Sequence, residues 1–384
     1  MATTLDYLGV ADRWVVFERE LNQSVLRVYD LQGRMVRVDT TTAAAYVTPA
    51  GLFQLGHSKD HRPDLPQVKI AMSVLDPLGL PLTTTVVAGQ MADDPLYLPE
   101  IAKVRQTART PGLTYVGDCK MAAIGTRAEI VAHQDYYLCP LSAKQMPDTE
   151  LDRVLAPVLH DALEPSAIRL PNAAGTVDET AEPVAMGFAY TVELSAPDQA
   201  GQVRTWQERR LVVRALAFAA SQEKSLRQRV TRAVTELDAL DERKQGKPRL
   251  PNAAAASQAA AAILAKHRVE GLVTVTVTTE VHAHVKRRYG TRPATTVRSE
   301  RVRVCAAREE GPLAQAVQRL GWRVYATNHT TEGLSLAQGV AAYRSEYLIE
   351  HGFGRMKPPR SKLRGITREG IVCETPRFLT LFPL

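Results

Sequence analysis

The chain has 384 residues, of which 45% are hydrophobic and 23% charged, and this composition is that of a globular protein with one large domain or two to three smaller ones. No apolar run approaches the ~20 residues of a membrane helix, and the N-terminus lacks the features of a secretion signal, so we expect a soluble cytoplasmic protein without a membrane partner. The four cysteines lie far apart with no Cys-x-x-Cys pair, which favours free thiols over a zinc site or a disulfide framework.

The first clear element is the stretch RMVRVDTTT, residues 34–42, where apolar residues lead up to an aspartate. This pattern predicts a strand with Asp39 at its end. Two more apolar runs follow at residues 67–75 and 80–89, separated by the turn sequence DPLG. We expect these two runs to form an antiparallel hairpin.

Residues 91–109 predict a helix, because two aspartates suited to capping are followed by a proline suited to the first turn. A short strand that ends at Asp118 comes next, followed by a helix and a fifth strand (residues 121–131 and 135–141). A right-handed crossover would lay the first and fourth strands side by side and parallel. Asp39 and Asp118 would then be neighbours, although an aspartate at a strand end is commonly only a turn residue.

Residues 142–320 differ in composition and are interpreted as an insertion domain. They pass through a basic helix at 222–241 and an alanine-rich stretch at 253–267. The strongly alternating run at 271–290 predicts one or two long strands. After the insertion, the sequence predicts a last strand over 321–328 and a last helix over 334–357.

Tyr343, Glu350 and Lys357 recur every seven residues in this last predicted helix. Seven residues come within about 20° of two full helical turns, so the three side chains would project from one face. A tyrosine, a carboxylate and a lysine on one face suit a functional surface. The alternative is salt bridging within the helix, for which Glu346 and Glu350 have basic neighbours.

Basic residues are concentrated in two stretches of the chain. Residues 351–370 hold six lysines and arginines against one glutamate, and residues 204–232 hold eight against two glutamates. Clusters of this kind suit a polyanion, of which nucleic acid is the commonest in the cytoplasm. A solvated helix face is the alternative for either cluster.

The chain resembles the DDE transposases of bacterial insertion sequences, in particular the group whose catalytic helix carries a Tyr-x2-Arg-x3-Glu-x6-Lys signature. The resemblance covers roughly residues 34–357. It rests on the segments VDTTT, LGHSKDHRPDLPQVKIAMSV, GLPLTTTVVAGQMAD, VGDCKMAA, GWRVYATN and AYRSEYLIEHGFGRMK.

The resemblance implies an α/β fold with an RNase H-like core, a mixed five-stranded sheet with flanking helices that is interrupted by a large, mostly β insertion domain. The expected division has five parts. These are a short N-terminal remnant (1–33), the first part of the core (34–141), the insertion domain (142–320), the last strand and catalytic helix of the core (321–357), and an irregular basic tail (358–384).

The family's chemistry implies that Asp39, Asp118 and Glu350 form an acidic triad that holds two Mg²⁺ ions, for which Mn²⁺ may substitute. Hard oxygen ligands suit Mg²⁺, and two such ions can activate a nucleophile and neutralise the leaving oxygen at a phosphodiester. The expected activity is therefore metal-dependent DNA cleavage and strand transfer. The implied partners are transposon ends and target DNA, bound by a homodimer in the synaptic complex.

The resemblance also predicts contacts to DNA phosphate, which position a strand without reading its bases. Tyr343 and Lys357 are expected to make them from the last helix. The signature has arginine where this chain has Glu346, and Arg344 is the nearest substitute. The remaining candidates are Arg355, Trp322, and Lys59, His61 and Arg62 of the polar loop LGHSKDHRPDLPQ. A core position is the alternative for Trp322. A metal site at His57, Asp60 and His61 is the less favoured interpretation of the loop, since it lacks a fourth ligand.

Two features of the ends depart from the family pattern. Only 33 residues precede Arg34, and the last residues show no helical periodicity, so we expect a truncated copy. Two alternatives therefore stand beside an active transposase. One is a catalytically inactive remnant that only binds DNA, and the other is an RNase H-like nuclease that acts outside transposition.

Overall fold

The structure is a computed structural model that describes residues 2–171, 176–240, 242, 250–286 and 295–356. The chain divides into two compact units. The first unit comprises residues 1–154, 165–213 and 323–384, and the second comprises 155–164 and 214–322. Apart from residues 321 and 322, the second unit lies in the range predicted as the insertion domain, whereas residues 165–213, expected in the same domain, belong to the first unit.

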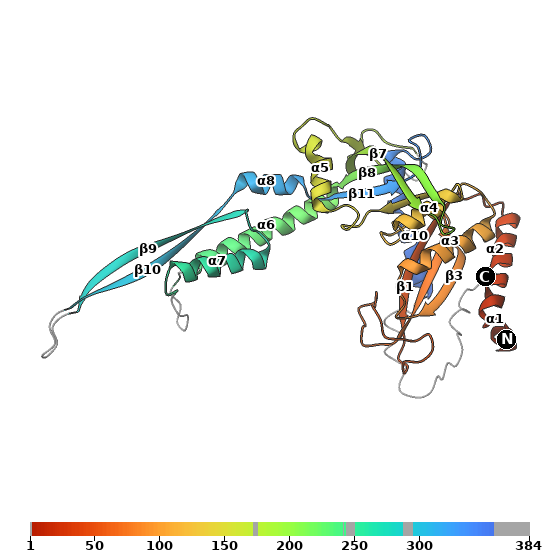
Figure 1. The fold of residues 1–384 in the computed structure, drawn as a ribbon, viewed down its shortest axis with the longest axis horizontal. Coiled ribbons are helices and arrows are strands. Elements are labelled where there is room, and N and C mark those ends of the chain that lie inside the picture. Colours follow the sequence, from red (N-terminus) through yellow and green to blue (C-terminus); the bar gives the residue numbers. More distant parts are fainter. Residues whose placement is uncertain (1, 172–175, 241, 243–249, 287–294, 357–384) are drawn as a thin grey trace. The chain divides into compact units, whose positions relative to one another are not determined.

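The first unit is built on a mixed sheet flanked by helices (Figure 1). Among the described residues the sheet has nine strands in the order β3-β2-β1-β4-β5-β11-β8-β7-β6. The strands are β1 (Met35–Ala44), β2 (Gln67–Leu75), β3 (Leu80–Ala88), β4 (Thr114–Gly117), β5 (Tyr136–Pro140), β6 (Ser166–Ile168), β7 (Ala185–Pro197), β8 (Val203–Ala215) and β11 (Trp322–Thr327). The helices are α1 (Ala2–Leu8), α2 (Ala11–Val28), α3 (Asp94–Ala108), α4 (Ile124–Ala132), α5 (Asp148–Leu159), α9 (Leu336–Arg344) and α10 (Tyr347–Met356). Residues 155–159 of α5, 214–215 of β8 and 322 of β11 belong to the second unit.

The predicted hairpin and the predicted parallel pair are both present among the first five strands. β2 is antiparallel to both β1 and β3, and β4 is parallel to both β1 and β5. β1 continues past Asp39 to Ala44, because its pairing with β2 extends to Ala44 opposite Gln67. Its pairing with β4, however, ends at Val38 opposite Gly117. Asp39 and Asp118 therefore follow directly after the last paired residues of neighbouring parallel strands.

The alternation of β1 separates a core face from the face that carries Asp39. Val36 and Val38 are buried in a core that includes Tyr97 and Ile101 of α3. On β2, Met72 pairs with Asp39 and packs against Ile349 and Phe353 of α10. Burial of these apolar side chains fixes α10 beside the strands that carry the candidate site.

A buried ion pair links α4 to β8 in the first unit. The Arg127 guanidinium contacts the Glu208 carboxylate, and their side chains are 5% and 0% exposed. Tyr137 Oη donates to Glu208 Oε2 (2.6 Å), and Trp206 Nε1 donates to Tyr137 Oη (2.8 Å). These groups enclose the Glu208 carboxylate completely. The stability of the network therefore depends on every group that donates to this carboxylate.

A second buried carboxyl group holds α2 against β3. Glu18 accepts hydrogen bonds from the backbone N–H of Thr84 (3.0 Å) and from Thr84 Oγ1 (2.6 Å). Burial raises the pKa of Glu18 to about 7, although the bonds from Thr84 oppose the shift. Folding therefore favours the protonated carboxyl group.

We expect the stability of the protein to fall as the pH rises from about 4.5 to 7. Between these values the folded protein keeps the Glu18 proton that the unfolded chain has already lost. A Glu18→Gln variant should lack this loss, which amounts to at most about 3 kcal/mol. Urea unfolding of both proteins at several pH values measures it, with Glu20→Gln as an exposed control. Parallel stability curves for wild type and Glu18→Gln would contradict the expectation.

The second unit combines helices with a two-stranded antiparallel sheet (Figure 1). Its elements are α6 (Leu216–Asp238), α7 (Ala253–His267), β9 (Val273–Lys286), β10 (Thr295–Arg308) and α8 (Glu310–Gln318). The long strand predicted from the alternating run is confirmed as β9. The unit also contains more helix than the mostly β expectation. Alanine has the highest helix propensity, and the Asn252 side chain caps the alanine-rich α7 by accepting from Ala255 N (2.8 Å).

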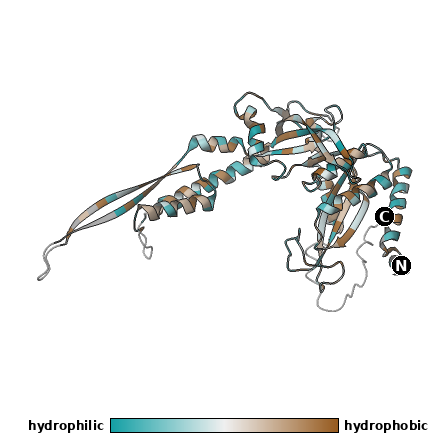
Figure 2. Ribbon diagram, in the orientation of Figure 1, coloured by the Kyte–Doolittle hydropathy of each residue, from teal (hydrophilic) through white to brown (hydrophobic). Residues whose placement is uncertain are grey.

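The apolar residues of α6 face the inside of the second unit. Leu226, Val230 and Leu237 are buried in one cluster with Ala260 of α7 and Val273 of β9. Figure 2 shows hydrophilic and hydrophobic residues alternating along α6, as expected for a helix with one covered face. Within the described part of the chain, no helix is long and apolar enough to cross a membrane.

Candidate active site

The ends of β1 and β4 border a small cavity in the first unit. Its volume is about 20 Å³, which is room for about one water-sized particle. The lining side chains come from β1, β4 and the segment from α9 to α10. They are Arg37, Val38, Asp39, Val116, Gly117, Asp118, Tyr343, Glu346 and Ile349. The predicted neighbourhood of Asp39 and Asp118 is thus present in the structure.

Asp39 is a carboxylate in a largely buried and locally negative position. Burial is the main cause that raises its pKa, and with the added effect of the charges of Asp118 and Glu346 the pKa of Asp39 is about 6. The charge of Lys59 and a hydrogen bond from Thr40 N (2.7 Å) act in the opposite direction. A cation bound beside Asp39 would remove the remaining repulsion.

Asp118 is oriented by two donors. Tyr97 Oη donates to Asp118 Oδ1 at 2.6 Å, and Lys120 N donates to the same oxygen at 2.8 Å. Tyr97 itself is buried, and its pKa is raised by burial and by the charges of Asp118 and Asp39. The phenol therefore keeps its proton and fixes one oxygen of Asp118. No pattern in the sequence marks Tyr97 as a site residue, because it reads as an ordinary apolar position of α3.

Lys59, a predicted DNA contact, is directed toward the site. Its Nζ donates to Thr40 O (2.5 Å) and Thr40 Oγ1 (2.8 Å). The same nitrogen lies 3.7 Å from Asp39 Oδ1 and 3.7 Å from Asp93 Oδ2. In this structure the lysine supplies the positive charge next to Asp39.

The continuous helix predicted over residues 334–357 is wrong, because the structure contains two helices, α9 and α10, with a break at Ser345 and Glu346. A continuous helix needs a hydrogen bond from Glu346 N to Ala342 O. Instead, Glu346 N donates to Tyr343 O (3.3 Å), and Arg37 Nη2 donates to Ala342 O (2.5 Å). The Arg37 side chain, held by Asp76, thus takes the carbonyl that the next turn would have used.

The break changes which glutamate enters the cavity. Both glutamates are exposed, but only Glu346 lines the cavity together with Asp39 and Asp118. The charge of Glu350 nevertheless raises the pKa of Glu346, so the two carboxylates interact. Tyr343 lines the cavity and packs on Tyr325, with ring centroids 4.7 Å apart. Lys357 lies outside the described residues.

The other predicted DNA contacts are spread over the surface. Arg62 forms a bidentate pair with Asp64 (2.8 and 2.7 Å) and donates to Tyr46 Oη (3.0 Å). His61 is exposed, as are Arg344 and Arg355. Trp322 Nε1 donates to Gln318 O (3.0 Å). Apart from Arg355, the basic cluster of residues 351–370 lies outside the described residues.

The donor atoms of the cavity suit a hard divalent cation. Asp39, Asp118 and Glu346 offer only carboxylate oxygens, which Mg²⁺ and Mn²⁺ prefer over nitrogen or sulfur ligands. Among the described residues, however, no three histidine, cysteine, aspartate or glutamate side chains are arranged closely enough to hold one ion together. Of the three predicted metal ligands, Asp39 and Asp118 line this cavity together.

Comparisons with known proteins give little further information. No protein-family model matches the chain, and no curated protein does. Among solved structures, a piggyBac transposase in a synaptic complex with hairpin DNA is similar over 50% of this chain and 38% of its own chain. The sequence identity is 12% and the TM-score 0.26. A similarity this low carries no argument about fold or function.

Proposed function

We propose that this chain is a transposase of the DDE type, which cleaves DNA and joins DNA strands with the help of Mg²⁺. The observation that supports it most is the placement of Asp39 and Asp118 at the ends of neighbouring parallel strands, under α10. The five strands lie in the order β3-β2-β1-β4-β5, and β2 alone runs in the opposite direction to the other four. This arrangement supports the RNase H-like core implied by the sequence resemblance.

In this proposal Asp39 and Asp118 hold Mg²⁺, and Glu350 supplies the third carboxylate. Bound Mg²⁺ would make a water or a 3′-hydroxyl more acidic and neutralise charge on the leaving oxygen. Tyr97 keeps Asp118 in one orientation through its 2.6 Å hydrogen bond. Lys59 balances the charge of Asp39 and lies close enough to contact a DNA phosphate at the same edge of the sheet. The DNA partners are transposon ends and target, bound by a homodimer.

A second candidate is a protein that binds DNA without cutting it. The exposed position of Glu350, outside the cavity that holds the two aspartates, favours this candidate. The two candidates differ in one property, since only the first cleaves a phosphodiester when a divalent cation is added.

Nicking of supercoiled plasmid by the purified chain separates the candidates. We expect cleavage with Mg²⁺ or Mn²⁺ that EDTA abolishes and that Asp118→Asn reduces at least about 1,000-fold, because the variant keeps the acceptor oxygen for Tyr97 but loses the metal-binding charge. Asp12→Asn, an exposed change on α2, should cut like wild type. Equal nicking by wild type and Asp118→Asn would exclude the proposed site. A folded wild type that binds DNA and leaves the plasmid intact would establish the second candidate.

A further inference from the structure

The positive charge of the chain is concentrated in the second unit. Its residues, 155–164 and 214–322, contain 20 lysines and arginines against 12 aspartates and glutamates, a difference of +8, whereas the whole chain has a net charge of +7. The other residues together are therefore slightly acidic. A field of one sign over one unit attracts an anionic partner to that unit.

The structure divides the arginines on α6 and at its start into two groups. Arg214 donates to Leu320 O (2.9 Å) and Val317 O (3.0 Å), beyond and within the last turn of α8. Arg229 donates to His267 O (3.1 Å) and Arg268 O (3.2 Å), at the end of α7. Both donate to carbonyl groups at the C-terminal ends of helices, where the regular helical hydrogen bonds stop. These two arginines are structural.

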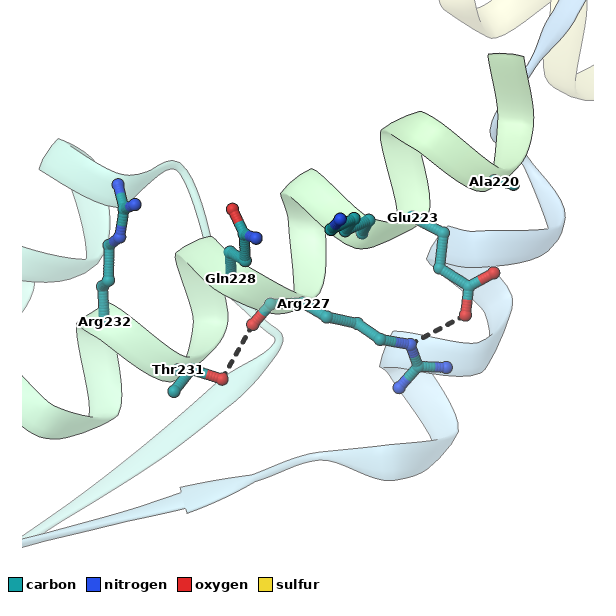
Figure 3. A pocket seen from close by; sticks show the side chains of 7 residues that line it. Ala220, Glu223, Arg227, Gln228, Thr231 and Arg232 are labelled. Atoms are coloured by element: carbon teal, nitrogen blue, oxygen red, sulfur yellow. Dashed lines mark hydrogen bonds and ion pairs between the residues drawn. The ribbon is translucent and has the colours of Figure 1, made fainter. Parts of the chain in front are cut away.

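The second group faces solvent along successive turns of α6. Lys224, Arg227, Gln228, Thr231 and Arg232 are exposed and line one open pocket, which also includes Ala220 and Glu223 (Figure 3). We call these five residues the α6 cationic face. Their positions recur at intervals of three and four residues, which places them on neighbouring turns of one side of the helix.

The charge on this face is only partly balanced. Glu223 Oε1 accepts from Arg227 Nε at 2.7 Å (Figure 3). Among the described residues, Lys224 and Arg232 have no ion-pair partner. Arg308 of β10 adds a further guanidinium, which donates from Nη2 to Thr231 Oγ1 (3.1 Å). The face therefore presents an excess of positive charge together with the amide of Gln228, while the Thr231 hydroxyl already donates to Arg227 O (2.9 Å).

The composition of the face distinguishes between anionic partners. A protein interface or a lipid surface would need an apolar centre, but the only apolar residue lining the pocket is Ala220. The large apolar residues Leu226, Val230 and Leu237 of α6 are buried on its other side. Charged and polar donors without an apolar centre suit a phosphodiester backbone.

We propose that the α6 cationic face binds the phosphate backbone of double-stranded DNA, independently of base sequence. The identity of the nucleic acid rests on the proposed function. From Lys224 to Arg232 the helix rises about 12 Å, and a duplex carries about seven phosphate charges over that length of its axis. Each of the three cations can thus meet a phosphate, while the aspartate site lies in the other unit of the chain.

Binding of the full chain to a fluorescein-labelled 30-base-pair duplex, followed by anisotropy in EDTA, tests this proposal. The variant is Lys224→Gln/Arg227→Gln/Arg232→Gln. The control is Arg109→Gln/Lys144→Gln/Arg153→Gln, which removes the same charge from exposed positions of the first unit. We expect the α6 variant to lose at least about tenfold in affinity at 100 mM salt and its slope of log K against log salt to become shallower by about 2 to 3. The control should change less than about twofold.

Equal losses in both variants would overturn the proposal, because net charge alone would then account for binding, and so would unchanged binding by the α6 variant. A variant that loses affinity for labelled polyglutamate and keeps its affinity for DNA would assign the face to an acidic protein. Lys224→Glu alone provides a second test if the triple variant unfolds. Since EDTA prevents cleavage and Asp118→Asn should bind DNA like wild type, a failure here is separate from a failure of the proposed catalytic site.

Discussion

Glu350→Gln is expected to reduce Mg²⁺-dependent nicking at least about 100-fold, whereas Glu346→Gln is expected to reduce it less than about tenfold. Glu350 follows Ile349, whose buried side chain fixes α10 next to Asp39. In the proposed site, Glu350 would reach a cation beside the aspartates from outside the cavity, which it does not line. Glu346 instead enters a cavity of about 20 Å³ that already contains two carboxylates.

The same amide substitution at two positions one helical turn apart makes this comparison strict, because both variants change the local charge equally. Glu332→Gln, an exposed change before α9, controls for the net charge. Initial nicking rates at saturating Mg²⁺ provide the measurement. If Glu346→Gln shows the larger loss, the third metal-binding carboxylate is Glu346, which lines the cavity, and not Glu350.

Local patterns in the sequence were enough to predict the half of the site that depends on the sheet. Hydrophobic periodicity located β1 and β4, and the handedness of crossover connections placed them side by side. Asp39 and Asp118 could therefore be paired although 78 residues separate them in the chain. Locating the two strands and placing them side by side required only the sequence of the strands and of their connections.

The helical half of the site could not be predicted in the same way. At the break between α9 and α10, Arg37 donates to Ala342 O from 305 residues away in the sequence. Tyr97 is similar, since only the folded α3 brings its hydroxyl to Asp118. Periodicity describes one segment at a time, and these contacts join segments that are distant in the chain.

For the basic cluster at residues 204–232, too, the sequence could not predict the role of each residue. Composition alone treats its arginines as equivalent, but Arg209 is buried and donates to the carbonyl groups of Thr330 (2.9 Å) and Leu334 (2.8 Å). Lys224 and Arg232 remain exposed. Only the fold separates the arginines that satisfy backbone groups from the cations that are available to a partner.

Arg127→Met is expected to lower the free energy of unfolding by about 3–5 kcal/mol, the largest stability effect predicted for a single change in the first unit. The substitution leaves the Glu208 carboxylate, which is 0% exposed, without its principal countercharge. Tyr137 Oη still donates to Glu208 Oε2 at 2.6 Å, and the Arg210 guanidinium lies 3.3 Å from Oε1. A neutral hydroxyl and one long contact do not replace the lost ion pair.

The double variant Arg127→Met/Glu208→Leu should recover a substantial part of this loss, because the fully buried charge is then gone, although Arg210, whose side chain is 15% exposed, loses its contact to Glu208. The coupling energy from the two single variants and the double variant measures the pair itself. Urea unfolding followed by circular dichroism supplies the four free energies, and Arg153→Met, at an exposed position, supplies a control for the substitution. A cost below about 1 kcal/mol for Arg127→Met would mean that water reaches Glu208, and that α4 is not held to β8 by this charge.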